Sequence, residues 1–469
     1  MDPQNSMVLK SGIWYTISNL ILKCISLLTT PLFTRLLTKQ QYGDYNNFIS
    51  WQGIVIIFVT LNLEASLISA KFDYKDKFKQ YIFSILTLSS VSTTVWLVLC
   101  NIFMAPLSAF MEINPLYINL MLIYCGFYVA INIYQISERY FYRYKTSVAI
   151  ALGTAFGSTF LSLFLVYSLR DGLFGRILGG VMPTILVGLF LYLMIACSGK
   201  RIDFSAWKYA LKVCLPYIPH LLSLTVLNSV DRVMITKICG SEYNALYSVA
   251  YSCGAMVTIL MTSMNNAFSP WLGDKLHIKD YVAIRKVSKV YIAGFCYLAV
   301  GIMILAPEVL LVMGGQSYMD AKFVMPPVAM GCVCQFLYTM FVNVEQFEKK
   351  TIGMAFASAA AALLNLGLNA VFIPMFGYIA AAYTTLAGFL FLLVIHMLLV
   401  KKYGYGEVYN YKLVVAIVGT MMLITGGMNL LYTNMVLRII AIVAYVLALG
   451  VVFKKCKDAG LIERFLKKK

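Results

Sequence analysis

The chain has 469 residues, of which 61% are hydrophobic and 12% are charged, and its mean hydropathy is +0.79. This composition excludes a soluble multidomain protein and indicates a polytopic membrane protein. The formal net charge of +18 does not point to nucleic acid, because the basic residues lie in short gaps between apolar runs, as they do in the cytoplasmic loops of membrane proteins.

The first apolar run, from Gly12 to Leu37, carries one positive charge, Lys23, near its middle. In a helix that enters the bilayer near Ser11, Lys23 lies about 18 Å along the axis, close to the centre of an apolar core about 30 Å thick. Inserting a lysine there costs about 2.5 to 3.5 kcal/mol, so we expect its side chain to face a water-filled path inside the protein. Such an ammonium suits an anionic cargo. Alternatively, Lys23 pairs with an acid or reaches the interface, and only holds helices together.

Fourteen apolar runs of about 20 residues are predicted to be transmembrane helices. The first run lacks the short apolar segment and small-residue cleavage site of a signal peptide, so we expect it to be retained as an uncleaved span. With the N-terminus and every even-numbered loop assigned to the cytoplasm, 29 basic residues lie inside and seven outside, which predicts cytoplasmic termini. The predicted spans are residues 12–36, 47–70, 81–104, 116–137, 147–169, 176–197, 213–238, 245–268, 290–313, 322–345, 352–373, 378–400, 413–432 and 435–453.

A short internal repeat indicates two related lobes. Residues 34–45 and 236–247 share, at an offset of 202, a threonine, a basic residue, an apolar pair, a polar turn and a tyrosine that opens the next span. The stretches 201–212 and 271–289 are predicted to be amphipathic helices on the inner leaflet. The predicted units are an N-terminal lobe at 1–200, a linker at 201–212, a C-terminal lobe at 213–402, and two extra spans with a basic tail at 403–469.

Two stretches follow the order of a family pattern. The stretch 214–255 has a proline-bearing span, then DR at 231–232, an apolar stretch, a glycine and ALYS at 245–248; the stretch 12–50 has Pro31, TRLL at 34–37 and YG at 42–43. In these residues the chain resembles a branch of the multidrug, oligosaccharidyl-lipid and polysaccharide exporter superfamily. This branch consists of the oligosaccharide flippases for O-antigen and capsule repeat units.

The resemblance implies an all-α polytopic membrane fold of two six-helix lobes in parallel pseudo-repeat, with two extra C-terminal helices and a central cavity. It implies a transporter, not an enzyme, that moves a polyprenyl-pyrophosphate-linked oligosaccharide from the cytoplasmic to the outer leaflet by alternating access, for surface polysaccharide biosynthesis. The expected location is the bacterial cytoplasmic (inner) membrane. The expected partners are this lipid-linked sugar, membrane lipids, and polysaccharide polymerase and chain-length regulator proteins, with no nucleic acid.

Polar residues on the first and seventh spans are the candidate cargo-binding groups. A pyrophosphate and a glycan need positive charge and hydrogen-bonding groups at membrane depth. Asn19 and Lys23 lie four residues apart, as do Asn228 and Arg232, so each pair shares a helix face. Arg35 is predicted to join Arg232 in a basic rim at the exit. Alternatively, the asparagines only hold helices together.

Two acidic residues are candidates for coupling transport to H⁺ or Na⁺. Asp231 either neutralises its neighbour Arg232 or binds the coupling ion. Glu64, about 9 Å from the inner end of the second span, either balances Lys23 or reaches the interface. The 11 cysteines form no CxxC, and the chain has no GxxxxGK[ST] and no metal motif, so we expect no metal and no other cofactor.

Three other functions stay open. A cation-coupled multidrug antiporter of the same superfamily would move cations and would need an acid in the cavity of the first lobe, where the first span carries Lys23. A membrane polymerase or ligase of lipid-linked glycans is disfavoured, because no outer loop exceeds about a dozen residues. A scaffold within a polysaccharide assembly complex would tolerate the loss of Lys23.

Overall fold

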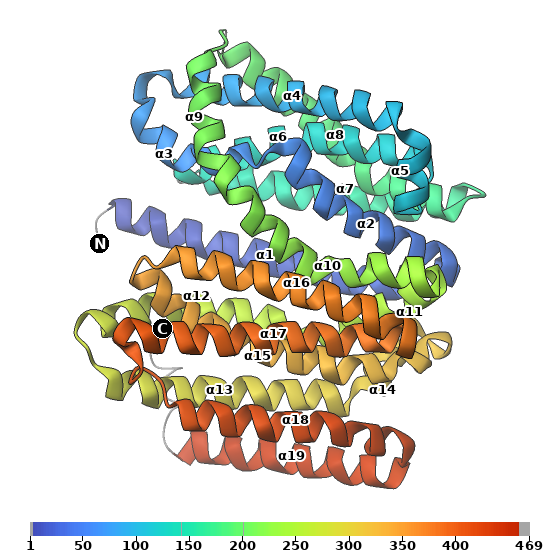
Figure 1. Cartoon of the computed structure of the whole chain (residues 1–469), viewed down its shortest axis with the longest axis vertical. Helices are drawn as coiled ribbons and strands as arrows, with labels where there is room; N and C mark the ends of the chain where they lie inside the picture. The colour runs from blue at the N-terminus through green and yellow to red at the C-terminus, as the bar shows by residue number, and fades with distance from the viewer. Residues whose placement is uncertain (1–2, 142, 200, 459–469) are drawn as a thin grey trace.

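The computed structural model describes residues 3–141, 143–199 and 201–458, and every regular element within them is a helix (Figure 1). The predicted all-helical membrane fold is therefore confirmed. Long apolar segments form helices in a bilayer because their backbone groups find partners only within the segment. The first helix group consists of α1 (Pro3–Leu36), α2 (Lys39–Thr60), α3 (Leu67–Asp73), α4 (Phe78–Ile102), α5 (Met104–Met111), α6 (Pro115–Tyr140), α7 (Tyr144–Ser168) and α8 (Gly172–Gly199).

The predicted count of fourteen spans is approximate. Twelve helices in the described residues are long and apolar enough to cross a membrane, a bent pair brings the number to 13, and the apolar stretch Met435–Gly450 is shorter. After α9 (Phe204–Cys214), the second helix group consists of α10 (Ile218–Cys239), α11 (Ser241–Gly254), α12 (Val257–His277), α13 (Tyr281–Ile304), α14 (Ala306–Gly314), α15 (Met325–Phe347), α16 (Thr351–Phe376) and α17 (Tyr378–Val400), and the chain continues with α18 (Tyr411–Thr433) and α19 (Met435–Asp458).

The second predicted span is broken. Helices α2 and α3 meet at an angle of 52° across a short 3₁₀ turn, Leu63–Ser66. At the break Leu61 and Asn62 have φ of 53° and 49°, in the left-handed region that side chains with a Cβ rarely adopt. Both residues prevent α2 from continuing straight into α3.

One of the two predicted amphipathic helices is present. Helix α9 begins at an Asp203 N-cap, and the indole Nε1 of Trp207 donates to Ser84 O at 2.7 Å. Its buried residues are Ala206, Ala210 and Cys214. The second prediction, at 271–289, is wrong, because α12 runs on to His277 and α13 begins at Tyr281.

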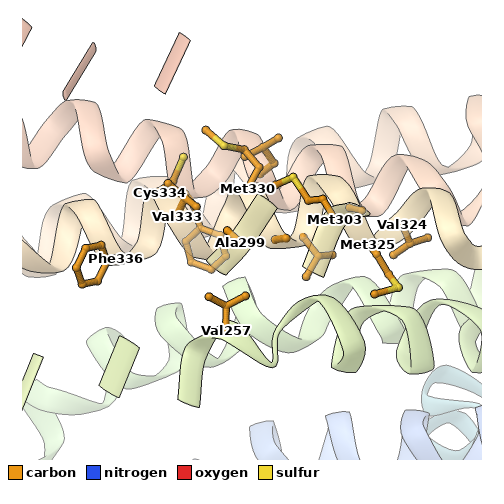
Figure 2. Packing of buried hydrophobic residues seen from close by; sticks show 14 of the residues in the cluster. Val257, Ala299, Met303, Val324, Met325, Met330, Val333, Cys334 and Phe336 are labelled. Atoms are coloured by element: carbon orange, nitrogen blue, oxygen red, sulfur yellow. The ribbon is translucent and has the colours of Figure 1, made fainter. Parts of the chain in front are cut away.

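The largest buried cluster lies mainly in the second helix group and extends to α1, α2, α7 and α18 (Figure 2). Helix α15 is its centre, and most of its residues are buried, including Met325, Met330 and Phe336. Val257 of α12 and Met303 of α13 pack in the same cluster. A helix that is apolar around its whole circumference is stable only when neighbours or lipid cover every side, and here protein covers most of α15.

The ends of the bundle differ in charge and in contacts. We call the end with the loops around residues 71–80, 138–146, 199–212 and 346–351 the basic face, and the other end the opposite face. Helix α2 begins at Lys39 and α11 at Ser241, 202 residues later, so the repeat in the sequence matches two helix starts. The division of the chain at 201–212 stays a prediction.

The two helix groups pack tightly at the opposite face. Asn244 Nδ2 donates to Gly43 O at 3.0 Å, and the hydroxyl of Ser241 donates to Asp44. Thr34 Oγ1 donates to Met313 O at 2.7 Å, which ties α1 to α14. These contacts close the space between α1, α2, α11 and α14 at this end.

Candidate functional site

Lys23 lies where the first helix group meets the second. Its Nζ donates to Thr262 Oγ1 of α12 at 3.3 Å, and the side chain is half-buried. Within the described residues no carboxylate lies within 4.0 Å of this ammonium. An ammonium has three N–H donors, and one hydroxyl satisfies only one of them. The position can therefore offer two donors and a positive charge to another molecule.

Asn19 and Asn228 differ in how they are placed. Asn19, one turn before Lys23 on α1, is exposed. Asn228 is half-buried on α10, and its Nδ2 donates to Leu224 O of the same helix at 2.7 Å. The side-chain oxygen of Asn228 is thus available to another donor, and the side chain of Asn19 is exposed.

Arg35 and Arg232 have separate partners in the structure. Arg35 NH2 donates to Val312 O at 3.0 Å, in the last turn of α14, where a cation is favoured by the helix dipole. Arg232 lies over the ring of Tyr251 at 4.5 Å and donates to Asn228 O at 3.0 Å. Arg35 therefore closes a contact between the helix groups, while Arg232 stays with α10 and α11.

Asp231 of α10 is completely buried in the second helix group. Its Oδ2 accepts a hydrogen bond from the hydroxyl of Tyr247, and another from Thr385 Oγ1 at 3.0 Å. Its Oδ1 has no partner. Although Arg232 is adjacent in sequence, no basic nitrogen of the described residues lies within 4.0 Å of the carboxylate.

A polar cluster continues from Asp231 into α16 and α17. Asn365 Nδ2 donates to Thr385 Oγ1 at 3.2 Å, and Asn369 Nδ2 donates to Asn365 Oδ1 at 3.2 Å. The hydroxyl of Thr384 donates to Asn369. The sequence analysis missed these four residues, although two asparagines four apart in an apolar helix are a signal that polar groups face a protein interior.

Glu64 lies at the break between α2 and α3. Its Oε1 accepts a hydrogen bond from Asn132 Nδ2 of α6 at 3.1 Å, and its Oε2 is buried without a partner. It stands in the first turn of Leu63–Ser66, where an acid is favoured by the helix dipole. Lys23 is not within ion-pair distance of it.

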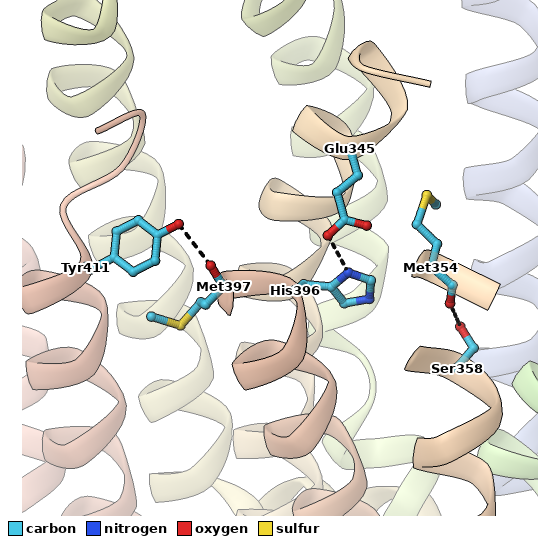
Figure 3. Close-up of polar contacts among 6 residues, drawn as sticks. All are labelled: Glu345, Met354, Ser358, His396, Met397 and Tyr411. Carbon is cyan, nitrogen blue, oxygen red and sulfur yellow. Dashed lines mark hydrogen bonds and ion pairs between the residues drawn. The ribbon is translucent and has the colours of Figure 1, made fainter. Parts of the chain in front are cut away.

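Two further polar features involve residues that are not among the predicted site residues. The Arg176 guanidinium of α8 lies over the rings of Phe33 and Tyr45, at 3.6 and 4.4 Å, between α1 and α2. His396 Nδ1 of α17 lies 2.9 Å from Glu345 Oε1 of α15, and both side chains are buried (Figure 3). The second contact joins two helices through buried ionisable groups near the basic face.

The fold matches solved transporter structures. The lipid II flippase MurJ in an inward closed conformation has a TM-score of 0.66 and 14% identity, with 96% of this chain and 100% of that chain covered. A multidrug resistance MATE family transporter in an inward-facing conformation has a TM-score of 0.57 and 14% identity, covering 82% and 98% of the two chains. At this identity the likeness shows the fold alone.

Two sequence comparisons agree with the fold. A family model described as polysaccharide biosynthesis protein matches residues 8–275. The Lsg locus putative protein 1 of Haemophilus influenzae (strain ATCC 51907 / DSM 11121 / KW20 / Rd) is 22% identical over 348 residues, which cover 72% of this chain and 84% of that protein.

The fold and the family model together place the chain in the multidrug, oligosaccharidyl-lipid and polysaccharide exporter superfamily of membrane proteins. Within it, the chain belongs to the polysaccharide biosynthesis protein family. The resemblance read from the sequence is thereby confirmed.

Proposed function

We propose that the chain is a flippase that moves a polyprenyl-pyrophosphate-linked oligosaccharide from the cytoplasmic to the outer leaflet of a bacterial inner membrane. The observation that carries the proposal is Lys23, an ammonium between the two helix groups with one hydroxyl partner and no carboxylate within 4.0 Å in the described residues. An anionic pyrophosphate supplies the charge and acceptors that this ammonium lacks. The family and the likeness to a lipid II flippase support the same class of cargo.

In this proposal the cargo enters from the basic face. The contacts of Gly43 with Asn244 and of Thr34 with Met313 hold the opposite face closed. Rocking of one helix group against the other then opens the opposite face and closes the basic face, as in alternating access. The basic face is cytoplasmic in this scheme, because it carries most of the basic residues.

Asp231 is the proposed coupling group for H⁺ or Na⁺, because it is buried, has a free Oδ1, and is reached by hydroxyl groups of α11 and α17. Glu64 is the second candidate, at the break of α2. Asn19, Asn228 and Arg232 are proposed to line the cargo path. Released cargo would be used by a polysaccharide polymerase and its chain-length regulator.

A multidrug antiporter is the second candidate, since the MATE transporter shares the fold. A cationic drug would be repelled by Lys23, so replacing Lys23 by a neutral residue separates the two functions.

Complementation tests the proposal. A bacterium that lacks its own flippase for a matched glycan receives the wild type, Lys23→Arg or Lys23→Gln at equal membrane expression, and surface glycan is measured. We expect rescue by the wild type and by Lys23→Arg, and a loss of at least about tenfold for Lys23→Gln, since a charge-assisted contact contributes about 1.5 to 3 kcal/mol. Equal rescue by Lys23→Gln would remove Lys23 from the cargo path. Transport of organic cations by Lys23→Gln, with no glycan rescue by any form, would favour the antiporter.

A further inference from the structure

A pocket at the basic face is separate from Lys23 and Asp231. It lies between the ends of α4, α6 and α8 and has a volume of about 400 Å³. Pockets that hold small ligands measure roughly 300 to 1,000 Å³. The pocket is therefore large enough for the headgroup of a lipid.

Charges of both signs line this pocket at different depths. Lys75, Lys79 and the acid Asp76 are exposed at its edge, where the lysines outnumber the acid, whereas Glu138 is buried in α6. Arg143, which is 69% exposed, forms an ion pair with Glu138, but its Nη1 lies 3.7 Å from Glu138 Oε1, beyond hydrogen-bond distance. The Glu138 carboxylate therefore keeps acceptors for a donor inside the pocket, and the lysines keep donors for an anion at the entrance.

The remaining lining is mostly apolar. Phe78 and Ile82 of α4 and Met194 and Ile195 of α8 contribute it. The pocket stands where the apolar spans α4, α6 and α8 end at the basic face, which is the level of lipid headgroups. An amphiphile can place its polar end on the charged groups there, and its glycerol and upper chain on the apolar side.

We propose that this pocket binds a phospholipid of the surrounding membrane whose headgroup is phosphoethanolamine. The phosphate lies at Lys75 and Lys79, and the primary ammonium donates to Glu138. A purely anionic headgroup such as phosphoglycerol matches the lysines but places hydroxyl groups at the buried carboxylate. A quaternary ammonium has no N–H to donate. The lipid is a resident ligand and not the transported cargo, so the inference stands independently of the proposed function.

Native mass spectrometry of the full chain in detergent tests the site. The probes are dihexanoyl phosphatidylethanolamine, phosphatidylglycerol and phosphatidylcholine, added one at a time at equal concentration. We expect phosphatidylethanolamine to bind about fivefold to tenfold more tightly than either other lipid, as one charge-assisted hydrogen bond allows. Equal binding of all three would overturn the proposal.

Two variants separate the roles of the charges. Glu138→Gln should lower the affinity for phosphatidylethanolamine to that for phosphatidylglycerol and leave the affinity for phosphatidylglycerol unchanged. The double variant Lys75→Gln with Lys79→Gln should lower the affinity for both lipids. Lys145→Gln, an exposed lysine of the same face outside the pocket, is the matched control and should change neither. A preference that survives in Glu138→Gln would contradict the proposal.

A measurement on the wild type does not depend on the folding of a variant. Phosphatidylethanolamine with a diazirine in its upper acyl chain should label peptides that contain Phe78 and Ile82 or Met194 and Ile195. Excess unlabelled phosphatidylethanolamine should suppress this labelling, and phosphatidylglycerol should suppress it less. Labelling confined to other helices would place the lipid elsewhere.

Discussion

Single polar residues in an apolar chain carry much of the information about this protein. An aspartate at the centre of a transmembrane helix costs about 2.5 to 3.5 kcal/mol. Asp231 accepts hydrogen bonds from Tyr247 and Thr385, and a hydrogen bond to a charged group contributes about 1.5 to 3 kcal/mol. The two bonds thus offset part of the cost of burying Asp231, and its Oδ1, which has no hydrogen-bond partner in the described residues, is available to a proton or a cation.

Replacement of Asp231 tests the coupling role. In Asp231→Asn the side chain keeps its shape but can no longer take up a proton or balance a cation, so flipping driven by a proton or sodium gradient should fall at least about tenfold. The measurement is transport into vesicles with imposed gradients of each ion, at equal protein per vesicle. Asp320→Asn changes an exposed acid and serves as the control. Unchanged gradient dependence in Asp231→Asn would leave Asp231 a structural residue and move the search to Glu64.

At the scale of helices, α2 and α11 pack closely at Gly43. A Cβ added at Gly43 would lie 1.7 Å from Ser241 O and 2.5 Å from its carbonyl carbon. Both are backbone atoms, so no side-chain rotation relieves the clash. The contact therefore requires glycine at position 43, and this position belongs to the repeated stretch found in the sequence.

Gly43→Ala should force α2 and α11 apart. Overpacking of this kind costs about 1 to 3 kcal/mol, so the thermal unfolding midpoint in detergent should fall. Gly153→Ala in α7 is the matched control, because its new methyl group meets no atom within 4 Å and alanine favours the helix by up to about 1 kcal/mol. Equal thermal unfolding midpoints for the two variants would show that α2 and α11 can move apart without a loss of stability.

At the scale of the whole molecule, the two helix groups are joined at the opposite face, and in the proposed function this arrangement is one state of the transport cycle. Thr34 with Met313 and Asp44 with Ser241 are contacts between the groups at this end. Alternating access requires that these contacts break in the other state. The arrangement thus predicts where a covalent link would stop transport.

A double variant, Asp44→Cys with Ser241→Cys, in a chain whose 11 native cysteines are replaced tests this motion. Oxidation should form a link across the opposite face and abolish flipping, and reduction should restore it. Each single variant, treated in the same way, should keep transporting. Full transport by the linked protein would mean that the cargo leaves without separation of α2 from α11.

The amino-acid sequence by itself determined the helices, most of their limits and the superfamily, and it singled out Lys23 and Asp231 as charged residues within predicted spans. These follow from hydropathy and residue order, which are local properties because each helix satisfies its own backbone. The tertiary structure decided which side chains meet. Thr262 lies 239 residues from Lys23, and Thr385 lies 154 residues from Asp231, so only the rotation and packing of whole helices bring them together. The same packing bends α2 at Leu61 and Asn62, and places the Arg35 guanidinium against Val312 of α14.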